Sequence, residues 1–159
     1  MNILLAIDDS PCSQAAVESV IKRPWPSDTK VHVLSVVEPF HPEYAGWHTS
    51  YVPLALEAQK ERVESVRKLV EENAQRLKSR LSAECVTFEA AEGYIKDKIL
   101  DKAVAWPADL IVMGSHGRRG LEKWLLGSVS QAVVAHAPCS VEIVRMERSA
   151  AEAAGSTLP

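Results

Sequence analysis

The sequence lacks several features that would point to a specialised class of protein. It has 18 Lys and Arg residues against 21 Asp and Glu residues, a formal net charge of -3, and so lacks the basic excess of domains that coat a phosphate backbone. No apolar run approaches the roughly 18 residues that a membrane helix needs. We expect no signal peptide, because the first apolar residues have no basic flank and run into Asp8. These absences predict a protein of the cytoplasm that binds neither nucleic acid nor membrane.

Cysteine is scarce, and the spacing of the cysteines suggests no disulfide pairs. The three cysteines, Cys12, Cys85 and Cys139, are odd in number and far apart, which suits neither a disulfide framework nor a CxxC motif. We expect them to be small buried apolar side chains in a reducing compartment. His41 and His48 have no third ligand type nearby at a set spacing, so we expect no metal site built from protein ligands.

What the sequence does contain is a regular alternation of short apolar runs and amphipathic stretches over 159 residues. This alternation is typical of an α/β fold, and the length suits a single domain. We predict an open five-stranded parallel sheet with helices on both faces, similar to a Rossmann fold. The expected strands span residues 3–7, 30–37, 85–90, 109–113 and 139–145. The expected helices begin near residues 11, 54, 95 and 128.

Two segments fall outside this pattern. Residues 40–53 are rich in proline and large aromatic side chains, which predicts an irregular loop. Residues 147–159 are rich in Ala, Ser and Gly, which predicts a flexible tail after a domain that spans residues 1–146.

The residues with the clearest chemistry follow the fourth expected strand and open the fourth expected helix. They are Gly114, Ser115, His116 and Gly117, and then, after nine residues, Gly127, Ser128, Val129 and Ser130. Glycines let a backbone approach a ligand closely and take positive φ, and the first N–H groups of a helix are unpaired donors that favour an anion. This pattern favours phosphate binding. Neither a P-loop nor a G-x-G-x-x-G fingerprint is present, however, and glycine in such a turn also serves geometry alone.

The G-x-x-G, nine residues, G-[ST] pattern resembles the universal stress protein family in its ATP-binding branch. The resemblance covers nearly all of residues 1–146. Its other parts are Asp8-x-Ser10 after the first strand, Val36 at the end of the second, and Ala137-Pro138-Cys139 before the last.

This resemblance implies a binding site for ATP, with Mg or Mn, at one edge of the sheet. The base and ribose would lie against Ala6, Ile7, Asp8, Val36 and Met113. The ribose and phosphates would lie on Gly114, His116 and Gly117, and the triphosphate on Gly127, Ser128, Val129 and Ser130. It also implies a homodimer through the last strand, which we expect to begin at Cys139 and end at Arg145.

Simpler roles remain open for several of these residues. Asp8 and Asp9 would also serve to end a strand and cap a helix, His116 to be an exposed loop residue, and Met113 to be part of the core. The basic side chains of this loop would also fit a solvated surface patch that binds no ligand; they are Arg118, Arg119 and Lys123. Its apolar side chains fit one face of a helical turn that anchors the loop; they are Leu121, Trp124 and Leu125.

Three functions are compatible with the pattern. The first is a regulatory stress-response module that binds adenine nucleotide, and the second is a slow ATPase or phosphotransferase that uses the same pocket. The third is a dimeric interaction protein without nucleotide. Because the chain shows no catalytic aspartate with asparagine and no lysine within a known motif, we expect binding without fast catalysis and assign no catalytic residue.

Overall fold

A computed structural model describes residues 1–39, 52–117 and 126–146 of the chain. These residues form a five-stranded parallel sheet in the order β3-β2-β1-β4-β5. Its strands are β1 (Asn2–Ala6), β2 (Lys30–Val37), β3 (Val86–Glu92), β4 (Leu110–Gly114) and β5 (Ser140–Val144). The predicted α/β fold is confirmed.

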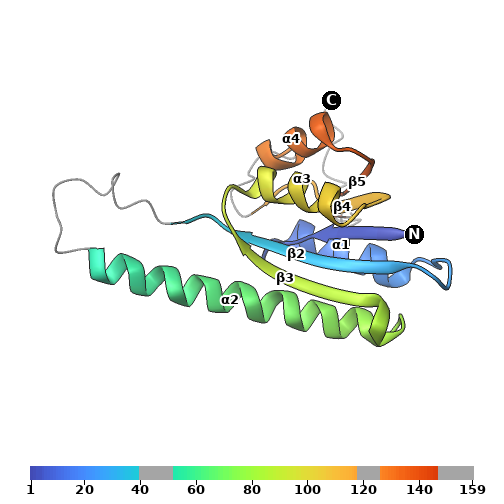
Figure 1. Cartoon of the computed structure of the whole chain (residues 1–159), viewed down its shortest axis with the longest axis horizontal. Coiled ribbons are helices and arrows are strands. Elements are labelled where there is room, and N and C mark those ends of the chain that lie inside the picture. Colours follow the sequence, from blue (N-terminus) through green and yellow to red (C-terminus); the bar gives the residue numbers. More distant parts are fainter. Residues whose placement is uncertain (40–51, 118–125, 147–159) are drawn as a thin grey trace, which may run out of the picture.

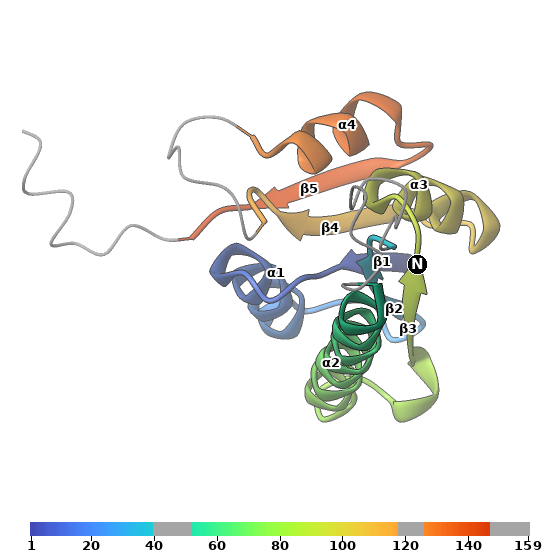
Figure 2. The same ribbon diagram turned by 90° about the vertical axis from the view of Figure 1, so that its left-hand side faces the viewer.

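The helices cover the sheet in two layers. They are α1 (Pro11–Lys22), α2 (Val52–Lys78), α3 (Ile95–Ala105) and α4 (Ser128–His136), with a short 3-10 turn, η3 (Ala83–Cys85), before β3. Figures 1 and 2 show α1 and α2 on one face of the sheet and α3 and α4 on the other. None of the described helices combines the length and the apolar character needed to cross a membrane.

The central strand β1 is buried on both faces, as its continuous apolar run predicts. Ile3 and Leu5 belong to the core between the sheet and α1 and α2, whereas Leu4 and Ala6 belong to the core on the α3 and α4 side. Side chains alternate across a strand, so a strand covered on both faces must be apolar at every position. This burial fixes the register of β1 and with it the place where the strand ends.

Helix α1 begins where its sequence signals place it. Ser10 is the N-cap and its Oγ accepts from the Ser13 N–H at 3.2 Å, while Pro11 takes the first helical position. Helix α2 begins at Val52, two residues before the expected Leu54, and includes Pro53. Proline is tolerated in a first helical turn because no N–H is needed there, so the expectation that Pro53 belongs to the loop is wrong. The rest of that expected loop, residues 40–51, lies outside the described residues.

The three cysteines are free but only half-buried, so the expectation of full burial is wrong. Each lies at the boundary of an element rather than in its middle: Cys12 in the first turn of α1, Cys85 at the end of η3, and Cys139 just before β5.

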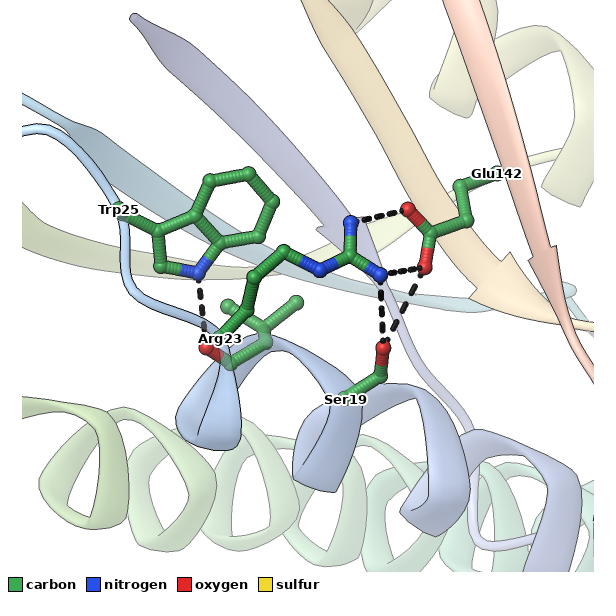
Figure 3. A network of polar contacts seen from close by, with 5 residues as sticks. Ser19, Arg23, Trp25 and Glu142 are labelled. Atoms are coloured by element: carbon green, nitrogen blue, oxygen red, sulfur yellow. Dashed lines mark hydrogen bonds and ion pairs between the residues drawn. The ribbon is translucent and has the colours of Figure 1, made fainter.

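The edge strand β5 is attached to α1 by an ion pair (Figure 3). The Arg23 guanidinium donates to both carboxylate oxygens of Glu142, at 2.6 and 2.7 Å, and lies over the Trp25 ring at 4.9 Å. The hydrogen bond and the positive charge of Arg23 hold the pKa of Glu142 below its ordinary value. The backbone just after α1 is thereby tied to the middle of β5.

Candidate functional site

The candidate site lies where the order of the strands reverses. From β1 the chain proceeds to β2 and β3 on one side, then crosses to β4 and β5 on the other. The carboxyl ends of β1 and β4 are therefore neighbours, and the chains that leave them diverge. Ligands of open α/β sheets bind in the crevice at such a point.

The first residue of this crevice is Asp8, which follows β1 and is oriented by the start of α1. Its backbone N–H donates to Ser13 Oγ at 2.9 Å. Its Oδ1 accepts from the Ser10 hydroxyl at 2.5 Å and from the Ser10 N–H at 3.1 Å. Within the described part of the chain, no hydrogen bond is made by Oδ2. One carboxylate oxygen is thus held by Ser10, whereas the other has no hydrogen-bond partner among the described residues.

The loop after β4 passes close to α1 and to Asp8. A Cβ on Gly114 would lie 2.8 Å from backbone atoms of Cys12 and Ser13, and a Cβ on Gly117 would lie 2.8 Å from Asp8 Oδ2. Residue 114 therefore needs glycine for space against backbone, whereas a side chain at residue 117 would have to displace the Asp8 carboxylate. Gly93 is the one described residue with positive φ, so the expectation of positive φ in this loop is wrong for its described glycines.

The same loop is held against the start of α4. The Gly127 N–H donates to the Ser115 carbonyl oxygen at 2.9 Å. The buried Ser130 hydroxyl lies 3.0 Å from the Gly114 carbonyl oxygen and 3.3 Å from that of Ser115. The sequence predicts that this hydroxyl binds phosphate, but in the structure its proton is used within the protein to hold the loop.

The first turn of α4 offers the backbone donors that the sequence predicts. Gly127 is the N-cap and makes no side-chain cap, and its carbonyl accepts from the Gln131 N–H at 2.9 Å to close the first turn. The N–H groups of Ser128, Val129 and Ser130 precede that bond and have no acceptor inside the helix. Ser128 is exposed at this end. The partial positive charge of a helix start favours an anion here.

Val36 presents its backbone to the same edge. The Leu34 carbonyl accepts from the Ile7 N–H at 2.8 Å, and the Val37 carbonyl accepts from the Gly93 N–H at 3.0 Å. Both polar groups of a strand residue point to one side, and the side alternates along the strand. Val36, two residues after Leu34, therefore directs its N–H and C=O toward the β1 side, beyond the point where β1 has ended.

A cavity of about 320 Å³ opens beside these groups. Asp8, Asp9, Ser35 and Val36 line it on the side of the sheet, and α2 side chains between residues 62 and 72 line the other side. Val66 and Leu69 supply apolar surface, whereas Arg62 supplies a positive charge. Most of the lining residues are polar or charged, including Lys68 and Glu72, so the cavity is a polar one with a small apolar patch at Val66 and Leu69.

The remaining predicted site residues belong to the core below the candidate site or to the loop after β4. Ala6 and Met113 pair across β1 and β4 and belong to the core on the α3 and α4 side, and Ile7 belongs to the opposite core. His116 is half-buried, with Nδ1 3.1 Å from Ser115 Oγ. Some residues singled out in the sequence lie outside the described part of the chain: His41, His48, Arg118, Arg119, Leu121, Lys123, Trp124 and Leu125.

Sequence reasoning missed two parts of the site. Ser13 was not singled out and Ser10 was named only within the Asp8-x-Ser10 pattern, although both contact Asp8, and no residue of α2 was assigned to the site although several line the cavity. A serine at an N-cap two residues after an acid was the available signal for the first. Nothing in the helical periodicity of α2 indicates which strand ends its polar side chains face. Among the described residues, no three His, Cys, Asp or Glu side chains come together to hold a metal ion.

Comparison with known proteins identifies the family. A model of the universal stress protein family matches residues 1–145. The universal stress protein MJ0531 of Methanocaldococcus jannaschii is 33% identical over 147 residues, which cover 90% of this chain and 81% of that protein. The chain belongs to the universal stress protein family. The predicted domain boundary at residue 146 stays a prediction.

Solved structures share the fold. The universal stress protein UspA from Lactobacillus plantarum has a TM-score of 0.72 at 27% identity, covering 91% of this chain and 97% of its own. A universal stress protein in complex with cAMP has a TM-score of 0.61 at 20% identity, covering 91% and 96%. A family protein from Arabidopsis thaliana with AMP bound has a TM-score of 0.59 at 18% identity, covering 98% and 97%. The last two likenesses show the fold alone.

Proposed function

We propose that this protein is a regulatory module that binds an adenine nucleotide, ATP with Mg or Mn, at the carboxyl edge of the sheet. The observation that carries the proposal is the convergence of three kinds of group there. They are the outward-facing backbone of Val36, the available Oδ2 of Asp8, and the N–H groups at the start of α4. Each matches a different part of a nucleotide.

The base is assigned to the cavity beside Val36. Adenine has a flat apolar face and an edge that carries both a hydrogen-bond donor and acceptors. Val66 and Leu69 offer apolar surface to the face, and the backbone N–H and C=O of Val36 offer a donor and an acceptor to the edge. Asp8 lines the same cavity, where its Oδ2 would accept from a ribose hydroxyl.

The phosphates are assigned to the loop after β4 and the first turn of α4. The N–H groups of residues 128–130 and the exposed Ser128 hydroxyl donate there, and Gly117 keeps the path from Asp8 free of side chain. Ser130 would contribute its backbone N–H rather than its hydroxyl, which is already used. The metal ion would be carried chiefly by the phosphate oxygens.

The relatives support an adenine nucleotide as the ligand class. One family structure of this fold holds AMP and another holds cAMP. The triphosphate is our choice because the start of α4 offers four donors, the N–H groups of residues 128–130 and the exposed Ser128 hydroxyl, besides the groups assigned to the ribose. The proposed role is binding without rapid turnover, because the chain has no catalytic aspartate with asparagine and no lysine within a known motif. We propose the cytoplasm as the compartment, in line with three free cysteines.

The experiment that tests this function identifies the ligand directly. Protein purified without added nucleotide is denatured, and the small molecules it releases are identified by mass spectrometry. The stripped protein is then titrated with ATP, AMP and cAMP, with Mg present, in a calorimeter. We expect adenine nucleotide in the released fraction and tightest binding of ATP. Absence of any adenine nucleotide from the released fraction, together with no binding of the three, would refute the proposal.

A further inference from the structure

The Ser10 hydroxyl has two acceptors but only one proton. Its Oγ lies 2.5 Å from Asp8 Oδ1 and 3.1 Å from the backbone carbonyl oxygen of His116, and it accepts from the Ser13 N–H at 3.2 Å. A serine hydroxyl donates one hydrogen bond, so the two acceptors compete for it. Ser10 is 4% exposed, which leaves little room for water to supply the acceptor that loses.

The two acceptors belong to different halves of the candidate site. Asp8 follows β1 and lies on the side of the cavity beside Val36, whereas His116 belongs to the loop that follows β4. That loop reaches the start of α4 through the bond from the Gly127 N–H to the Ser115 carbonyl. Ser10 therefore bridges the half assigned to the ribose and the half assigned to the phosphates.

We propose that Ser10 is a positioning residue that couples the two halves, so that ribose and phosphate groups bind cooperatively. The inference rests on the proposed function. A ribose hydroxyl that donates to Asp8 spreads the carboxylate charge over more hydrogen bonds and weakens its hold on the Ser10 proton. The Ser10 O–H, which keeps its proton, then donates its hydrogen bond to the His116 carbonyl and fixes the loop that receives the phosphates. Because coupling is reciprocal, phosphate on the loop strengthens ribose binding by the same factor.

A purely structural role for Ser10 makes a different demand on the side chain. As the N-cap of α1, Ser10 needs only an oxygen that accepts from Ser13, and glycine is tolerated at this position. Coupling instead needs the hydroxyl proton. The two roles are separated by a measurement that compares cooperativity between ligands rather than affinity alone.

The experiment uses the full chain and two fragments of the nucleotide. The affinity for adenosine is measured by calorimetry with and without saturating inorganic tripolyphosphate, and the ratio of the two affinities is the coupling factor. For the wild type we expect adenosine to bind at least about fivefold tighter with tripolyphosphate, the lower end of ordinary coupling between sites. Ser10→Gly should bring the factor to about one, and Ser10→Thr, which keeps the hydroxyl, should restore it.

Two further variants serve as controls for the effect of Ser10→Gly on the coupling factor. Ser13→Ala removes a neighbouring buried hydroxyl that accepts from the Asp8 N–H. Because this hydroxyl does not compete for the Ser10 proton, the variant should keep the wild-type coupling factor. Asp8→Asn replaces the charged acceptor while leaving Ser10 in place, so it should lower the factor toward one even if Ser10→Gly does not fold. Thermal unfolding of each variant reports its folded state.

The outcomes are distinct. If the wild type binds ATP and adenosine but its coupling factor is about one, or if Ser10→Gly and Asp8→Asn keep the wild-type factor, the coupling is refuted and the proposed function stands. If the wild type binds neither ATP nor adenosine, the proposed function fails and the coupling fails with it.

Discussion

Asp8 and Gly117 meet so closely that a side chain at residue 117 would begin 2.8 Å from Asp8 Oδ2. This oxygen belongs to the turn after β1, and Gly117 belongs to the loop after β4. The two segments that leave β1 and β4, where the order of the strands reverses, are therefore in contact through the Asp8 carboxylate and the Cα of Gly117. The contact determines what each position tolerates.

Gly117→Val should abolish ATP binding while leaving the fold intact. The new side chain would displace the Asp8 carboxylate and occupy the path between the proposed ribose and phosphate positions, yet Gly117 is itself exposed. Calorimetry with ATP and Mg measures the first effect, and thermal unfolding measures the second. Binding by Gly117→Val as strong as that of the wild type would show that the site is wrong.

Gly114→Ala is the control for this variant, because a side chain at residue 114 should act on stability. Its Cβ would meet backbone atoms of α1 at 2.8 Å, and backbone cannot give way as a side chain does. Overpacking of this kind costs about 1–3 kcal/mol. In a domain of this size each kcal/mol lowers the melting temperature by roughly 2–4 °C.

Ser128→Ala and Asp8→Ala should separate the two ends of the nucleotide. Loss of the Ser128 hydroxyl removes a hydrogen bond to a charged phosphate, worth about 1.5–3 kcal/mol, or roughly 10- to 150-fold in affinity. The loss should weaken ATP far more than adenosine. Asp8→Ala should weaken both ligands alike, since both carry the ribose. Equal effects of Ser128→Ala on ATP and adenosine would place the phosphates elsewhere.

Turnover should be negligible. We expect hydrolysis of ATP far below the roughly 1–100 s⁻¹ typical of kinases, because the site offers phosphate donors without a positioned base. Release of phosphate is measured on protein carried through a second purification. Release at ordinary enzymatic rates that persists through this step and disappears in Asp8→Ala would favour the alternative, an ATPase or phosphotransferase in the same pocket.

We predict a homodimer that pairs through β5, an edge strand of the sheet. The Val144 carbonyl accepts from the Ser115 N–H, so the alternate residues Val141 and Ile143 direct their backbone groups away from β4. Their side chains are half-buried, and a free edge with such residues is a template for pairing.

Val141→Pro tests the dimer because it removes an outward N–H and leaves the ladder with β4 in place. Light scattering should give a dimer mass for the wild type and a monomer mass for the variant, and circular dichroism should confirm that both are folded. A single monomer mass for the two proteins would contradict the prediction.

Stability should fall in mild acid because of His32, a residue of β2 whose buried ring faces the end of α3. Its Nδ1 lies 2.7 Å from Thr87 Oγ1, its Nε2 lies 3.6 Å from Glu89, and its ring packs on Trp106. Glu89 is paired with Lys102. Burial, with repulsion from Lys102, holds the pKa of His32 below its ordinary value, although Glu89 opposes the shift.

The direction of the pH effect follows from that shift. Below about pH 6.5 the unfolded chain takes up a proton at His32 that the folded protein resists, so the free energy of unfolding should decrease as the pH falls through this range. Urea unfolding between about pH 7.5 and 5.5 should show a shallower dependence in His32→Gln than in the wild type. His136→Gln, which removes an exposed imidazole, is the matched control. The same dependence in His32→Gln and the wild type would exclude His32 as the cause.

Local signals in the sequence determined the strands and helices and much of the candidate site. The continuous apolar run of β1 and the valine-rich β2 identify buried strands because only apolar side chains tolerate cover on both faces. The glycine pattern before α4 places phosphate donors at a helix start, since those N–H groups lack partners in any helix. Both inferences depend on neighbours within a few residues, which the sequence itself supplies.

Only the tertiary structure decided how these parts act on one another. Ser10 lies 106 positions from His116 in the chain, yet its hydroxyl lies 3.1 Å from the His116 carbonyl because β1 and β4 are paired. The same pairing puts Asp8 against Gly117 and turns the Ser130 hydroxyl toward the loop. Which acceptor a hydroxyl finds, and which glycine has no space for a methyl group, depend on atoms distant in sequence. Those contacts exist only once the strands have paired and the helices have packed on them.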